Sequence, residues 1–253
     1  MPIQSTSANA QTSSVLDPRL EAVFDAHGGR ASWAGVTAIE GQLSCGGFAL
    51  ASRLQRRALR CLRFRVEPHA RRVTLRDFGQ VGWVGTWSPA GVSLRDGNRL
   101  VGQRPDARAH FDRWVSVIAW DRLDVLYFAG YALWNYLSFP FLLGQPGVTV
   151  SFEDRRLVVD FPPDLPTHSP RQAFHLDVHG QLLRHDYTAE VYGRWAHVAN
   201  LVRGSTVTGG HRFYTRRRAW ARLGSGSAIV PWPLIIWIEL DDLVVAREEG
   251  ATP

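Results

Sequence analysis

Residues 125–143 constrain the fold more than any other segment, because their only polar side chains besides tyrosine are Asn135 and Ser138. A run of this length can cross a bilayer as a helix. It can equally form a helix buried on all sides within a domain. Charged residues at 121–124 flank the run and Pro140 interrupts it, so we favour burial and expect no integral membrane span.

The rest of the chain indicates a β-rich domain, in which short runs of alternating side chains are separated by turn residues. In residues 62–66, apolar and charged side chains strictly alternate, which is typical of a half-buried strand. The Gly46-Gly47 pair predicts a hairpin turn that leads into a strand at 48–54. The runs add up to about eleven short strands and three helices, and an open sheet of this size needs a covering layer.

Two of the helices can be bounded by their capping residues. Asp17 can cap a first helix, in which Pro18 suits the first position and Gly28 suits a left-handed exit. Asp121 can cap the apolar helix, which we expect to end near Ser138.

Composition predicts one domain with short, loose ends. Residues 1–16 are rich in small polar residues and are expected to be a disordered tail, 17–246 a single domain, and 247–253 a flexible C-terminus. The tail lacks the basic start and apolar run of a secretory signal, which predicts a cytoplasmic protein. Cys45 and Cys61 are too few for a disulfide scaffold or a metal knuckle.

The net charge of +6 raises the question of nucleic-acid binding. All 29 basic residues are arginine, and they are spread along the chain rather than clustered. Nucleic-acid binders usually gather charge on one face or interleave it with stacking aromatic residues, so we expect no nucleic-acid partner. The absence of lysine also excludes Schiff-base catalysis and pyridoxal phosphate attachment, and no motif predicts any cofactor.

The large rings of the apolar helix have two alternative uses, core packing and the floor of a pocket. Core packing is the commoner use of buried aromatic residues, whereas apolar pockets with a few polar tips hold hydrophobic molecules. We expect Tyr127, Tyr131, Trp134 and Asn135 to be the helical residues that contact a ligand. The predicted partner is therefore a hydrophobic small molecule.

The order of elements resembles the lipoprotein-carrier fold of the LolA and LolB group over 17–245. The N-terminal segment looks like the start of such domains, with a helix ending at Ala26-His27-Gly28-Gly29 followed by Trp33. Further motifs resemble an uncharacterised bacterial family of about this length: Tyr127 to Tyr131, Trp134 to Tyr136, Thr167-His168-Ser169, Arg184 to Tyr187, and Thr215 to Arg218. The resemblance implies a mainly β (α+β) fold, a curved half-open antiparallel β-barrel wrapped around an N-terminal helix and the inserted apolar helical segment, with an apolar cavity inside. The sequence lacks the export signal and lipobox cysteine of those carriers.

Candidate catalytic residues lie in the strand that contains Arg184-His185-Asp186-Tyr187. Alternation places His185 and Tyr187 on one face and Arg184 and Asp186 on the other. The pair His185 and Tyr187 can serve as an acid–base pair near neutral pH. The alternative is a polar strand face with only a structural role.

Three residues from other segments can join this pair across neighbouring strands: His168, His197 and Arg217. We expect His168 and Asp186 to be catalytic together with the pair, and Arg184, His197 and Arg217 to bind a ligand. A metal site built from His168, His185 and His197 lacks a spacing signature, so none is predicted.

Two functional classes remain open. The first is an intracellular protein that binds a lipid, polyketide or terpenoid in an apolar cavity. The second is a cofactor-independent cyclase, isomerase or hydratase that orients such a molecule and uses the His/Tyr pair.

Overall fold

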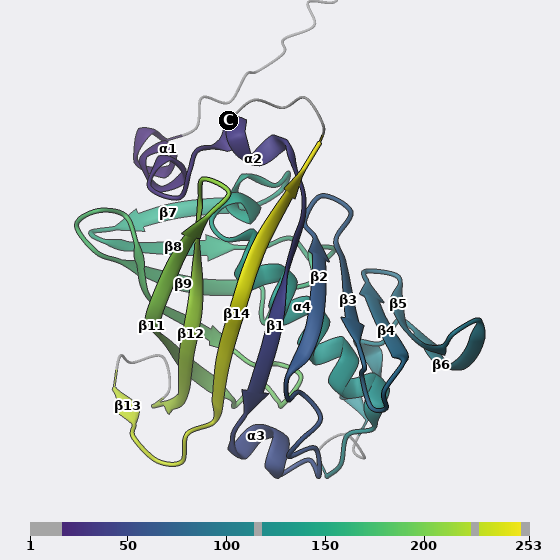
Figure 1. Cartoon of the computed structure of the whole chain (residues 1–253). Coiled ribbons are helices and arrows are strands. Elements are labelled where there is room, and N and C mark those ends of the chain that lie inside the picture. The colour runs from purple at the N-terminus through teal and green to yellow at the C-terminus, as the bar shows by residue number, and fades with distance from the viewer. Residues whose placement is uncertain (1–16, 114–117, 224–227, 249–253) are drawn as a thin grey trace, which may run out of the picture.

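A single antiparallel sheet dominates the computed structural model, which describes residues 17–113, 118–223 and 228–248. Its strands follow the order β6-β5-β4-β3-β2-β1-β14-β12-β11-β10-β9-β8-β7, and β13 pairs with β12 off this path. The end strands β6 and β7 do not pair with each other, so the sheet curves without closing (Figure 1). The predicted mainly β fold with a curved, half-open antiparallel sheet is therefore confirmed.

The strands have the following bounds: β1 Val36–Gly46, β2 Leu62–Glu67, β3 Arg72–Arg76, β4 Trp83–Ser88, β5 Gly91–Asp96, β6 Arg99–Pro105, β7 Thr149–Glu153, β8 Arg156–Asp160, β9 Arg171–Leu176, β10 Leu182–Thr188, β11 His197–Thr208, β12 His211–Arg222, β13 Ile229–Val230 and β14 Ile236–Arg247. The helices are α1 Pro18–Asp25, α2 Arg30–Ala34, α3 Phe48–Ala51, η1 Ala109–Asp112, α4 Arg122–Ser138 and η3 Phe141–Gly144.

The two halves of the chain meet at the centre of the sheet, where β1 pairs with β2 on one side and with β14 on the other. Helices α1 and α2 lie at one end of these central strands and α3 lies at the other end (Figure 1). This arrangement places segments from both ends of the sequence around one interior.

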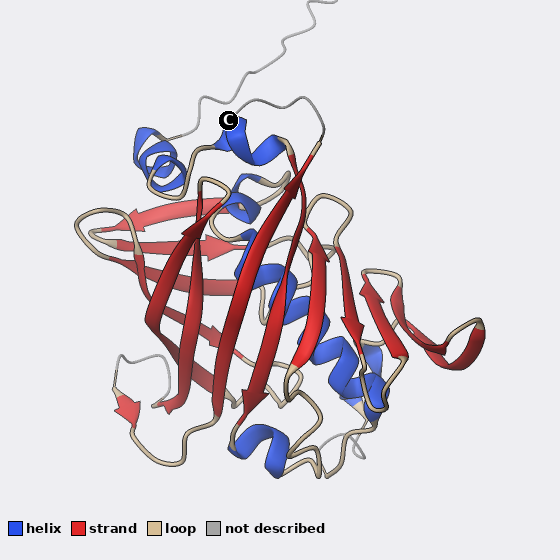
Figure 2. Ribbon diagram, viewed as in Figure 1, coloured by secondary structure: helices blue, strands red, loops and turns tan. Residues whose placement is uncertain are grey.

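Helix α4 fills that interior, with the sheet curved around it (Figure 2). Its side chains from Asp124 to Ser138 are all buried, and it packs against strands β2 to β6 and against β12. An unbroken apolar sequence suits this position because every face of the helix contacts protein. The expected burial is confirmed, and no helix in the described part of the chain combines the length and hydropathy needed to span a bilayer.

Both predicted helix caps are present. Asp17 accepts a hydrogen bond from the backbone N–H of Arg19 at 2.9 Å. At the start of α4, Asp121 and Asp124 form a reciprocal capping box, in which each carboxylate accepts from the other's backbone N–H. These bonds satisfy donors that a helix N-terminus otherwise leaves unpaired.

Replacing Asp121 with alanine should lower the free energy of unfolding by about 1 kcal/mol, because α4 loses its cap. Asparagine can still accept the backbone hydrogen bond, so Asp121→Asn should keep most of that stability. Urea denaturation of the two variants beside the parent protein checks this. Equal losses in both variants would mean that the negative charge, which also pairs with Arg104, matters more than the cap.

Two expectations about the strands were wrong. The described residues contain fourteen strands rather than about eleven, because several short strands are separated by turns of only a few residues. The Gly46-Gly47 pair does not lead into a strand, since Phe48 begins the short helix α3. The backbone at Gly47 has φ of 127° and packs closely on Ile235, so the chain turns away from β1 there. The predicted tail at 1–16 lies outside the described residues.

Candidate ligand-binding site

A cluster of hydrogen-bonded polar side chains lies buried between α4 and the sheet. Tyr136 is at its centre, with its hydroxyl 2.9 Å from His168 Nε2, 3.2 Å from the hydroxyl of Tyr187 and 3.2 Å from Asn200 Nδ2. His168 Nδ1 lies 3.1 Å from the hydroxyl of Tyr131. All five side chains are buried, so this network is part of the interior rather than of a wet surface.

Strand alternation and register explain how the sheet contributes to this network. His185 and Tyr187 are two residues apart on β10 and face inward together, with ring centroids 4.7 Å apart, as predicted. His185 pairs in register with Asn200 of β11. Tyr187 stacks on His168 with a centroid distance of 3.8 Å, so a loop residue completes the cluster.

Burial keeps both histidines of this cluster uncharged. It lowers the pKa of His168 well below its usual value, and the nearby charges of Arg108 and Arg217 lower it further. Burial also lowers the pKa of His185 strongly, with smaller contributions from His168 and Arg217. Burial raises the pKa of Tyr187 well above its usual value. At neutral pH the network therefore consists of neutral hydrogen-bonding groups.

Arg217 of β12 brings a charge into this interior. Its side chain is 1% exposed, and its guanidinium lies 4.2 Å from the ring centroid of Tyr136 and 5.8 Å from that of Tyr214. Its Nε and Nη1 have no hydrogen-bond partner among the residues that the structure describes. Buried charges are normally paired with an opposite charge, so a buried arginine with two unpartnered nitrogens is unusual.

A small cavity of about 30 Å³ lies next to the polar cluster, between α4 and the central strands. Most of its wall is apolar, and Tyr136 and Tyr187 supply two rings. It is lined by Leu43, Cys45, Leu59, Phe128, Ala129, Ala132, Leu133, Tyr136, Tyr187, Ile236 and Ile238.

A larger apolar pocket of about 220 Å³ opens at the α3 end of the sheet. It is lined by Phe48, Ala49, Ser52, Arg53, Ala189, Tyr192, Trp195, Ala196, His197, Val198, Ala221 and Ile235. Two of its aromatic side chains face solvent at the rim, since Phe48 is 54% and Trp195 is 73% exposed. Tyr192 of this pocket packs against Phe128 of the inner cavity, with centroids 6.2 Å apart, so aromatic rings separate the two spaces.

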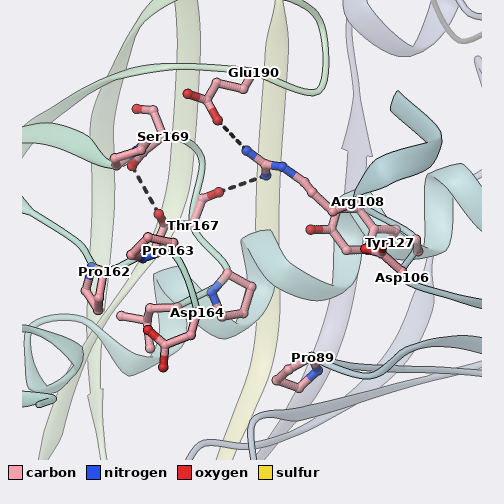
Figure 3. A pocket seen from close by; sticks show the side chains of 14 residues that line it. Pro89, Asp106, Arg108, Tyr127, Pro162, Pro163, Asp164, Thr167, Ser169 and Glu190 are labelled. Carbon is pink, nitrogen blue, oxygen red and sulfur yellow. Dashed lines mark hydrogen bonds and ion pairs between the residues drawn. The ribbon is translucent and has the colours of Figure 1, made fainter. Parts of the chain in front are cut away.

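A third pocket, of about 430 Å³, is more polar (Figure 3). Tyr127 of α4 lines it, together with prolines of the segment 162–170. Arg108 crosses it, pairing with Glu190 at 2.6 Å and donating to the carbonyl of Thr167 at 3.0 Å. Because Asp106, Arg108, Asp164 and Glu190 line it and much of its wall is polar, this pocket suits a hydrophobic molecule less well than the apolar pocket does.

Several residues predicted to belong to the site lie elsewhere. Arg184 and Asp186 face outward, where Asp186 accepts from Arg184 at 2.6 Å and lies 3.1 Å from His175 Nε2. Burial raises the pKa of Asp186, but hydrogen bonds from His175 and Arg184 outweigh it and leave this pKa below its usual value. This carboxylate therefore belongs to an ion pair on the other face of the sheet from His185.

The helical residues expected to contact a ligand divide into two pairs. Tyr127 lines the polar pocket and Tyr131 belongs to the buried network. Trp134 donates from Nε1 to the carbonyl of Pro68 at 2.9 Å, and Asn135 donates to the carbonyls of Tyr131 and Pro166. The polar atoms of this second pair are thus used within the protein.

His197 lies at the edge of the apolar pocket, with its Nδ1 3.0 Å from Thr188 Oγ1. It does not join His168 and His185 in a common cluster. No group of three or more metal-ligating side chains occurs in the described ranges of the chain.

Sequence reasoning missed four residues that complete the site: Gln172, Tyr192, Trp195 and Asn200. Gln172 lies 2.6 Å from His185 Nε2 and Asn200 is in register with His185, but no local pattern reveals which strands pair. Tyr192 and Trp195 lie in a connection between strands, where the sequence gives no periodicity.

The comparisons with known proteins concern structure alone, since no family model and no curated protein matches the sequence. The chain resembles a domain described as an outer-membrane lipoprotein-sorting protein from Vibrio parahaemolyticus, with 10% identity, a TM-score of 0.48 and coverage of 92% of this chain and 93% of that one. It also resembles a LolA superfamily protein from Nitrosomonas europaea, with 9% identity, a TM-score of 0.46 and coverage of 91% and 93%. A DUF1329 family protein from Desulfovibrio piger gives 10% identity, a TM-score of 0.46 and coverage of 92% and 95%. A LolA superfamily protein is thus among the solved structures that this chain resembles.

Proposed function

We propose that this protein binds a hydrophobic small molecule, such as a lipid, polyketide or terpenoid, in the apolar pocket between α3 and the sheet. The apolar pocket at the α3 end is the observation that carries this proposal. Its wall is almost entirely nonpolar, and Phe48 and Trp195 leave large apolar surfaces exposed at its rim. Exposed apolar surface around a concave apolar wall is typical of a binding site.

The dimensions of the site favour a slender ligand. A volume of about 220 Å³ is below the roughly 300–1,000 Å³ of pockets for drug-sized ligands. A single alkyl or prenyl chain fits such a space better than fused rings do. The inner cavity lies just behind Tyr192 and Phe128, so a rotation of these two rings would lengthen the site for a longer chain.

The alternative proposal is a cofactor-independent enzyme that uses the buried His/Tyr network on a similar molecule. The contact of His168 with both Tyr131 and Tyr136 supports it. A general base works best when its pKa is near the working pH, whereas burial lowers the pKa of both His168 and His185 strongly. These pKa shifts favour binding over proton transfer.

Filling the apolar pocket should abolish most of the binding. In Ala221→Phe, a large ring replaces a methyl group in the pocket wall, and we expect the affinity for the neutral dye Nile red to fall at least tenfold. Fluorescence titration of the full chain measures this affinity. The matched control is Val207→Phe, which places the same ring at a 58% exposed position on the neighbouring strand β11 and should change the affinity less than twofold. Equal affinities for the two variants would contradict the proposed site.

A further inference from the structure

Arg217 is a buried cation that lacks a counter-ion within the described residues. Its side chain is 1% exposed, no carboxylate forms an ion pair with it, and its Nε and Nη1 have no hydrogen-bond acceptor. The rings of Tyr136 and Tyr214 attract the guanidinium by cation–π contacts. Such contacts leave the planar N–H donors unused, although these donors suit an anionic acceptor best.

We propose that the molecule bound by this protein carries one carboxylate group and that the guanidinium of Arg217 binds it. This inference rests on the proposed function. Guanidinium and carboxylate can form two parallel N–H···O hydrogen bonds. Each edge of the guanidinium that can make such a pair contains one of the two unpartnered nitrogens of Arg217, so an anion on either edge would give that nitrogen an acceptor and neutralise the charge.

The surroundings of Arg217 favour a singly charged head group. His168 and His185, the nearest titratable bases on α4's side of the sheet, are held neutral by burial, so the cluster carries one positive charge. Tyrosine hydroxyls of the cluster, Tyr136 and Tyr187, are neutral donors that can support the same oxygen atoms. A phosphate monoester would bring a second negative charge that nothing in this cluster balances.

Arg217 also adjoins two residues that line the inner cavity. It lies over the ring of Tyr136 and pairs in register with Ile238, and both of these residues line the inner cavity. The side-chain amide of Asn200 can also change partners, because its Oδ1 has no hydrogen-bond partner among the described residues while its Nδ2 contacts Tyr136. If this amide is rotated by about 180°, Tyr136 can donate to Oδ1, and the amide N–H groups of Asn200 become free to contact the anion.

The test compares a carboxylate with its neutral ester. Dodecanoate and methyl dodecanoate share the same chain, and their affinities for the full-length protein can be measured by displacement of Nile red. We expect the parent protein to bind dodecanoate at least tenfold more tightly than the ester. In Arg217→Met, which keeps an unbranched side chain but removes the charge, this preference should disappear while binding of the ester remains.

The matched control is Arg218→Met, because Arg218 is the next residue on β12 and its guanidinium pairs instead with Glu239 at 2.6 Å. This variant should keep the preference for dodecanoate. If Arg217→Met does not fold, Arg217→Lys can replace it, since this variant retains a positive charge and should still prefer the acid. The comparison of dodecanoate with methyl dodecanoate in the parent protein requires no variant.

The outcomes separate this inference from the proposed function. Equal affinities of the parent protein for acid and ester would overturn the assignment of a carboxylate and leave hydrophobic binding intact. Tighter binding of dodecyl phosphate than of dodecanoate would overturn it as well. Failure of every probe, including Nile red, would overturn both the inference and the proposed function.

Discussion

Lowering the pH from 7 to 5 should destabilise the folded protein by several kcal/mol. Four buried histidines cause this loss, His27, His168, His185 and His211, which are at most 2% exposed. Burial lowers the pKa of His211 below its usual value. Burial lowers the pKa of His27 from 6.5 to about 4. With that shift, His27 alone should account for about 2 kcal/mol between pH 7 and 5. Burial lowers the pKa of His168 and His185 well below 6.5 and adds losses in the same direction.

The sign of this pH dependence follows from the number of protons that the folded and unfolded states bind. The unfolded chain binds a proton at each of these histidines as the pH falls through about 6.5, whereas the folded protein does not bind one until the pH is well below that. Unfolding therefore takes up protons at acid pH, and the free energy of unfolding decreases as the pH decreases. Above pH 6.5 both states carry neutral histidines, and these groups contribute no pH dependence.

Urea denaturation at a series of pH values between 5 and 8 measures this dependence. His27→Gln should flatten the curve, because one buried group that must remain neutral has been removed. A free energy of unfolding that is the same at pH 5 and pH 7 in the parent protein would show that these histidines are hydrated or charged in the folded state.

Replacing Gly130 with alanine should destabilise the protein by about 3 kcal/mol, a typical upper value for overpacking a core. A Cβ at Gly130 in the middle of α4 would overlap the Cβ and Cγ atoms of Trp87 on β4. Helix propensity predicts the opposite sign, since alanine in a helix interior is favoured over glycine by roughly 1 kcal/mol. The sign of the change therefore reports directly on how closely α4 packs on the sheet.

Gly144 provides the matched control for this substitution. A Cβ there would lie 3.6 Å from Phe24 Cζ, an ordinary van der Waals distance. Gly144→Ala should therefore be neutral or slightly stabilising. Thermal denaturation of both variants checks the pair, and a Gly130→Ala variant as stable as Gly144→Ala would contradict the packing of α4 against Trp87.

Local patterns predicted much of the fold, because they report on local physical causes. The apolar run from 125 to 143, with Asp121 before it, predicted a buried and capped helix, since capping and burial depend on neighbouring residues. Alternation likewise predicted that His185 and Tyr187 share one face of their strand, and the structure buries both side chains.

Contacts between distant segments could not be predicted from local patterns. The pairing of β1 with β14 and the register that brings Asn200 opposite His185 depend on the whole sheet. The environment of Arg217 depends on both, so its sequence neighbours Arg216 and Arg218 gave no sign that the middle arginine of the three is buried without a counter-ion among the described residues. The helix at Phe48 likewise depends on packing against Ile235 rather than on the preceding glycines.

Photo-cross-linking with a neutral alkyl diazirine tests the central claim, that a hydrophobic molecule binds in the apolar pocket at the α3 end of the sheet. Peptide mass spectrometry after irradiation locates the modified residues. We predict that labels concentrate on the wall of the apolar pocket, at Tyr192, Trp195 and Ala221, and that excess dodecanoate removes them. Labels spread over exposed apolar residues such as Val81, which is 91% exposed, with none in the pocket wall, would contradict the claim.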